Sequence, residues 1–141
     1  GYEHTGYFNN KYIPRAGYSK NTTELNYENN YRYIRYADVL LMAAEANNRG
    51  GISDSKAQSY LNQVRSRAGV SAINETGSAL TQAIWDERRL EFAGEGHRFF
   101  DLVRTGQAAN EISGFVAGKH EVFPIPQTEI DISGLTQNPG Y

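Results

Sequence analysis

Charged residues crowd one stretch of the sequence, DERRLEFAGEGHRFFDLVR, which runs from Asp86 to Arg104. Its nineteen residues hold five acids and four arginines, and no lysine. Carboxylates such as Glu87 and Glu91 are the residue types that glycosidases use as acid and base. Neighbouring arginines favour the ionised carboxylate, however, whereas a general acid must hold its proton. The pattern therefore argues against catalysis at this stretch.

The same stretch is also apolar, and a helical wheel at about 100° per residue shows where its charges fall. The expected apolar arc contains Leu80, Ala83, Ile84, Trp85, Leu90 and Phe92. Glu87, Arg88 and Glu91 lie within this arc, whereas Asp86 and Arg89 lie outside it. Since an isolated buried charge costs several kcal/mol, the charges within the arc must be paired. We expect a structural ion-pair network made of Arg35, Glu87, Arg88, Glu91, Arg98, Asp101 and Arg104.

Other kinds of reactive site lack their residues. The chain has no cysteine, and its three histidines, His4, His97 and His120, are too scattered for metal-ligand spacing. Neither a phosphate-binding glycine loop nor a nucleophile elbow is present. The sequence therefore predicts no catalytic residue, no metal and no cofactor. A net charge of −2 also argues against nucleic acid or an acidic membrane surface as a partner.

Hydrophobic periodicity predicts a mainly α fold. Helices are expected at about 35–49, 54–68, 78–93 and 97–105. The first two have a very short connection, which makes them an antiparallel hairpin similar to a tetratricopeptide repeat. In the first helix only Asp38 and Glu45 form a polar stripe, so one small domain should leave part of its apolar surface uncovered.

The 141 residues fit one domain with three parts. Residues 1–32 are an irregular, aromatic-rich lead-in, residues 33–106 are the helical core, and residues 107–141 are an extended tail with irregular loops. Tyrosines of the lead-in are candidate ligand-binding residues because their rings can stack on sugars; they are Tyr12, Tyr18, Tyr27 and Tyr31. The alternative is that these rings pack over the domain as part of a covering loop.

Five motifs in order resemble the C-terminal region of the SusD/RagB family. They are RYADVLLMAAEA, LNQVRSRAG, ERRLEFAGEGHRFFDLVRTG, PIPQTEI and a terminal QNPGY. The resemblance implies a partly represented SusD-like fold and a non-catalytic outer-membrane lipoprotein of the bacterial cell surface. Such a protein captures glycans or other nutrients for a SusC-like TonB-dependent transporter. The lipid anchor and most helices are expected in an N-terminal part absent from this chain, and the charged stretch carries over as a structural signature.

Two other functions stay open. A helical-repeat module for protein–protein interaction requires an exposed apolar groove on the hairpin. A glycosidase fragment requires two accessible carboxylates roughly 5 to 10 Å apart. Nutrient capture instead requires exposed aromatic rings near loops.

Overall fold

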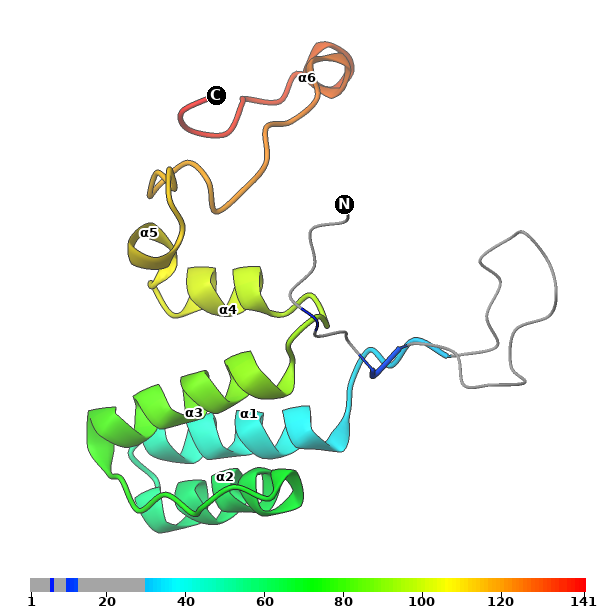
Figure 1. The fold of residues 1–141 in the computed structure, drawn as a ribbon. Coiled ribbons are helices and arrows are strands. Elements are labelled where there is room, and N and C mark those ends of the chain that lie inside the picture. The colour runs from blue at the N-terminus through cyan, green and yellow to red at the C-terminus, as the bar shows by residue number, and fades with distance from the viewer. Residues whose placement is uncertain (1–5, 7–9, 13–29) are drawn as a thin grey trace, which may run out of the picture. The chain divides into compact units, whose positions relative to one another are not determined.

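Every regular element in the described part of the chain is a helix (Figure 1). The computed structural model describes residue 6, residues 10–12 and residues 30–141. The helices are α1 (Tyr36–Arg49), α2 (Asp54–Ala68), α3 (Gly77–Glu91), α4 (Arg98–Arg104), α5 (Ala108–Glu111) and α6 (Gln127–Ser133). None of them is long and apolar enough to cross a membrane. The mainly α fold predicted from the sequence is confirmed, and the chain divides into two compact units, residues 1–88 and 89–141.

The core of the first unit lies among three helices, with α1 between α2 and α3 (Figure 1). Apolar residues at helical spacing supply it: Leu40, Leu41 and Ala44 from α1, Ala57, Leu61 and Val64 from α2, and Leu80 and Ile84 from α3. Full burial of a leucine or isoleucine side chain stabilises the fold by about 1.5–3 kcal/mol. Ser53 caps α2 by accepting a hydrogen bond from the Lys56 amide, and Gly69 ends the helix in the left-handed conformation, with φ at 74°.

A polar junction holds the end of α1 and the starts of α2 and α3 together. The Asp54 carboxylate accepts hydrogen bonds from the Gly77 amide and from Asn48 Nδ2, each at 2.7 Å. Asn48 Nδ2 also donates to the Gly77 carbonyl at 3.0 Å, and the Thr81 hydroxyl donates to Asn48 Oδ1. The Gly77 amide, followed by Asn48, lowers the pKa of Asp54, because both donors favour the ionised carboxylate.

The charges predicted to be buried on α3 are buried. Glu87, Arg88 and Glu91 are at most 7% exposed, whereas Asp86 and Arg89 are exposed. Leu90 is the error in the predicted arc, since it is 70% exposed. The apolar face of α3 therefore does not continue through Leu90 in the last turn.

The buried charges reach the hairpin through partners that the sequence analysis did not identify. Arg88 Nη1 lies 2.7 Å from Asp38 Oδ1 on α1, and Glu87 Oε2 lies 2.6 Å from Arg65 Nη1 on α2. Asp38 is only 6% exposed, although its position suggested a polar stripe. Two adjacent residues of α3 thus pin this helix to both helices of the hairpin.

Two other arginines of the expected network, Arg98 and Arg104, have identified partners within the second unit. Arg98 pairs with Glu111 at 3.2 Å, and Arg104 pairs with Asp101 at 2.7 Å. Both arginines are partly exposed, and exposed pairs contribute little stability. Of the pairs identified, the two formed by Glu87 and Arg88 are the better buried.

In the second unit, side chains near the end of the chain form hydrogen bonds with the backbone of an earlier segment of the tail. The Gln137 side chain accepts from the Ile125 amide and donates to the Ile125 carbonyl, at 2.8 and 2.9 Å. Asn138 Nδ2 donates to the Phe123 carbonyl, and the Tyr141 hydroxyl donates to the Val122 carbonyl. The terminal QNPGY motif therefore orders the VFPIP segment through side-chain bonds to its backbone.

Two short helices, α5 and α6, interrupt the tail that the sequence predicts to be extended and turn-rich. Pro126 is the N-cap residue of α6, with φ at −54° and ψ at 137°. Gln127 donates to Asp131 one turn later, and Gly134 ends the helix in the left-handed conformation. Prolines therefore do not exclude a helix from this tail, and one of them, Pro126, stands directly before α6.

The Asp54 junction makes stability depend on pH in a defined direction. Because the folded state lowers the pKa of Asp54, its contribution is present above the unfolded pKa and is lost as pH falls through the folded pKa. Asp54→Asn should lower the melting temperature at neutral pH, and its difference from the unsubstituted chain should shrink in acid. Thermal melts across pH measure this. Glu75→Gln, in the neighbouring loop, is the control, and a difference independent of pH would contradict the assignment.

The buried ion pair predicts unequal effects for two adjacent arginines. Arg88→Ala should destabilise the chain by about 3–5 kcal/mol, because it leaves Asp38 buried and unpaired. Arg89→Ala should cost about 0.5 kcal/mol or less, as an ordinary exposed change. Chemical denaturation of the two variants measures the losses, and equal losses would refute the structural role of Arg88.

Candidate functional site

Two of the four candidate tyrosines come together just before α1. The rings of Tyr12 and Tyr31 stack with their centroids 5.8 Å apart and their planes 21° from parallel. Tyr33 meets Tyr31 edge-on, with centroids 5.0 Å apart. The other two candidates, Tyr18 and Tyr27, lie outside the described residues. We call Tyr12, Tyr31 and Tyr33 the tyrosine cluster.

The tyrosine cluster exposes ring surface to solvent. Tyr31 is 56% exposed and Tyr33 is 82% exposed. The stacked rings of Tyr12 and Tyr31 are in contact, so a ligand must approach an outer surface instead of entering between them. Tyrosine rings offer an apolar face and a hydroxyl at the rim, a combination that suits the apolar faces and hydroxyl edges of sugar rings.

Sequence reasoning missed Tyr33, although a signal for it was present. Tyr31 and Tyr33 are separated by one residue in a segment that is not helical. Alternate side chains of an extended segment point to the same side, so spacing alone favoured a second ring beside Tyr31. The approach of Tyr12, which is distant in the sequence, left no comparable local pattern.

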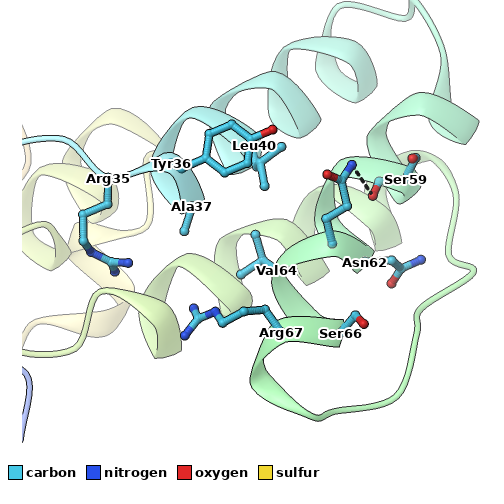
Figure 2. A pocket seen from close by; sticks show the side chains of 10 residues that line it. Arg35, Tyr36, Ala37, Leu40, Ser59, Asn62, Val64, Ser66 and Arg67 are labelled. Atoms are coloured by element: carbon cyan, nitrogen blue, oxygen red, sulfur yellow. Dashed lines mark hydrogen bonds between the residues drawn. The ribbon is translucent and has the colours of Figure 1, made fainter.

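A groove lies between the first half of α1 and the second half of α2 (Figure 2). Its volume is about 930 Å³, and its lining residues are Arg35, Tyr36, Ala37, Leu40, Ser59, Asn62, Gln63, Val64, Ser66 and Arg67. Leu40 and Val64 are almost fully buried, whereas Tyr36 is 73% exposed. Figure 2 shows Val64 pointing from α2 toward Ala37 and Leu40 on α1. The groove therefore has an apolar floor and an aromatic ring at its edge.

The amide side chains of this groove bind backbone groups of the chain. Asn62 accepts from the Ile73 amide and donates to the Ile73 carbonyl, which fixes the loop before α3 against α2. Gln63 donates to the Ser59 carbonyl at 3.3 Å, as the dashed line in Figure 2 marks. These amide contacts support the scaffold.

The acidic residues of α3 do not form an accessible pair for chemistry. Glu87 is buried against Arg65, and Glu91 is 7% exposed. Within the described residues, no group of three or more His, Cys, Asp or Glu side chains could hold a metal ion. The tyrosine cluster and the apolar surface of α1 remain as candidate groups for recognition.

Comparison with known proteins identifies relatives of one kind. The family model described as the SusD family matches residues 1–122. SusD-like protein P2 of Formosa agariphila is 33% identical over 151 aligned positions, which cover 93% of this chain and 30% of that protein. Two further SusD-like proteins of the same organism are matched over 24% and 20% of their lengths. The chain thus spans less than a third of the curated relatives it matches.

Solved structures agree with this assignment. A SusD homologue from Bacteroides thetaiotaomicron is 38% identical, with a TM-score of 0.68, over 75% of this chain and 24% of that one. Surface glycan-binding protein A from Bacteroides uniformis is 40% identical, with a TM-score of 0.62, over 80% of this chain and 28% of that one. On the family match, the sequence identity and the shared helical fold together, this chain belongs to the SusD family.

Proposed function

We propose that this chain is the C-terminal portion of a nutrient-capture protein that binds a glycan at the bacterial cell surface. The observation that carries the proposal is its family membership, supported by the likeness to a surface glycan-binding protein. The whole protein passes its ligand to a SusC-like TonB-dependent transporter in the outer membrane. A lipid anchor on another part of the protein attaches it to that membrane.

The tyrosine cluster is the contact with glycan that we propose within this chain. Its exposed rings supply stacking surface. Tyr18 and Tyr27, outside the described residues, stay candidates for the same role. Because the chain spans less than a third of its relatives, we expect most of the ligand site to lie elsewhere in the full-length protein. The isolated chain should therefore bind glycans weakly.

Capture without chemical change is the proposed mode of action. The carboxylates of α3 that are spaced like an acid and a base are the ones most deeply buried. Glu87 pairs with Arg65 at 2.6 Å, and this contact holds α3 against α2, which suits a structural role. We therefore expect the bound glycan to be released unchanged and to pass on to the transporter.

The alternative function, a helical-repeat module that binds protein, is favoured by a different observation. The hairpin carries a groove with an apolar floor of Leu40 and Val64, which is the feature that this alternative requires. In a member of this family, the two functions can reside on different surfaces of one chain.

Removal of one tyrosine ring should weaken glycan binding. Affinity electrophoresis in gels that contain soluble α-linked or β-linked polysaccharides detects weak binding as retardation. Tyr31→Ala should lose about fivefold in affinity, since the stacked area is worth about 1 kcal/mol. Phe123→Ala, which removes an 84% exposed ring in the tail, should migrate like the unsubstituted chain. Equal retardation of both variants would exclude the tyrosine cluster as the contact.

No polysaccharide should be shortened by the chain. Incubation of the purified chain with the same polysaccharides, followed by chromatography of the products, measures turnover. Oligosaccharide products that disappear with Glu91→Gln, while the circular dichroism of the variant stays unchanged, would overturn the proposal of capture without catalysis.

A further inference from the structure

The segment before α1 differs in charge from the rest of the chain. Residues 1–35 contain five lysines and arginines and three glutamates, a net charge of +2, whereas the whole chain carries −2. In the described part of this segment, every charged side chain is a cation: Lys11, Arg32 and Arg35. The first acid of α1, Asp38, is buried in an ion pair with α3. The tyrosine cluster therefore belongs to a locally positive segment.

Two of these cations adjoin the rings of the tyrosine cluster along the chain. Lys11 directly precedes Tyr12, and Arg32 stands between Tyr31 and Tyr33. Stacking of Tyr12 on Tyr31 brings the two short segments together, with the ring centroids 5.8 Å apart. Lys11 and Arg32 are both exposed. Each of the two segments that form the stacking surface therefore supplies an exposed cation.

The position of Arg32 suits an acidic group at the edge of a stacked sugar. By the alternation that places Tyr31 and Tyr33 on one side of their segment, the Arg32 side chain points to the other side. The rings can then cover the face of one sugar, while the guanidinium group meets substituents at its rim or on the next sugar. A guanidinium group binds oxyanions such as carboxylates through two parallel N–H donors.

We propose that the tyrosine cluster takes an acidic glycan and that Arg32 is its specificity-determining residue. The acidic group is a carboxylate or a sulfate ester, since both present the oxygen pair that a guanidinium group binds. The rings supply contact with the sugar faces, and the cation selects polymers that carry negative charge. This inference rests on the function proposed above, because it names the class of glycan that meets the same rings.

Matched polysaccharides separate the effect of charge from that of the sugar backbone. Frontal affinity chromatography of the 141-residue chain compares immobilised polygalacturonate with its methyl ester, and dextran sulfate with dextran. The acidic member of a pair should bind more tightly, and its advantage should shrink as sodium chloride is added, because salt screens exposed charges. An advantage within the first pair alone would assign a carboxylate, and within the second pair alone a sulfate ester.

Substitution of Arg32 tests its role in this preference. Arg32→Gln should weaken binding to the acidic polymer about threefold to fivefold, as expected for an exposed ion pair, and should leave binding to the neutral polymer unchanged. Arg32→Lys keeps the charge and should retain most of the affinity. Lys56→Gln removes a positive charge from an exposed position of α2 and is the control. Equal losses for Arg32→Gln and Lys56→Gln would overturn the role of Arg32.

Tyr31→Ala distinguishes failure of this inference from failure of the proposed glycan contact. It should weaken binding to both members of a pair, because stacking on an aromatic ring does not require a charged sugar. If the unsubstituted chain binds both members equally and Tyr31→Ala weakens both, the glycan contact stands and its preference for acid is refuted. Absence of binding to all four polysaccharides would refute the contact and the preference together.

Discussion

The buried ion pair between Asp38 and Arg88 fixes how the third helix sits on the α1–α2 hairpin. Both side chains are less than 10% exposed, and the joined atoms are 2.7 Å apart. Movement of α3 by one turn would separate two desolvated charges, which costs several kcal/mol, whereas small apolar shifts cost less. Glu87 adds a second constraint through Arg65 on α2. Leu80 and Ile84 of α3 are fully buried in the core beside these ion pairs.

This arrangement separates the scaffold from the surfaces that recognise other molecules. The charged residues that resemble a catalytic set in the sequence instead hold α3 on the hairpin, since Glu87 pairs with Arg65 and Arg88 with Asp38. The rings of the tyrosine cluster and the exposed apolar side of α1 lie on other parts of the first unit. A helical scaffold with exposed rings before α1 supports the capture function proposed above.

The sequence predicted the helices of the core because their apolar residues recur at helical spacing. It also predicted that Glu87 and Arg88 would be buried, because a charge within an apolar arc must follow that arc into the core. The partners could not be predicted in the same way. Asp38 resembled a polar stripe when α1 was considered alone, and only the packing of α3 shows that this stripe faces a guanidinium group.

Other features depended on contacts between distant residues. The meeting of Tyr12 with Tyr31 requires a chain path that local spacing does not encode. The prolines of the tail favour extended chain, so the sequence does not predict α6, although Pro126 stands directly before this helix. The prediction that Leu90 is buried is wrong because a helical wheel assumes that one face stays buried along the whole of α3. Periodicity thus predicts elements and burial more reliably than it predicts partners.

A double-mutant cycle on Asp38 and Arg88 tests the central claim most directly. Asp38→Leu, Arg88→Met and the double variant are each unfolded with denaturant. If the buried pair fixes α3, each single variant removes from a buried charge its partner across the 2.7 Å contact, and the double variant recovers much of the lost stability. The predicted coupling energy is about 2 kcal/mol or more. Losses that add to within about 0.5 kcal/mol would show that the two residues act independently and would contradict this account.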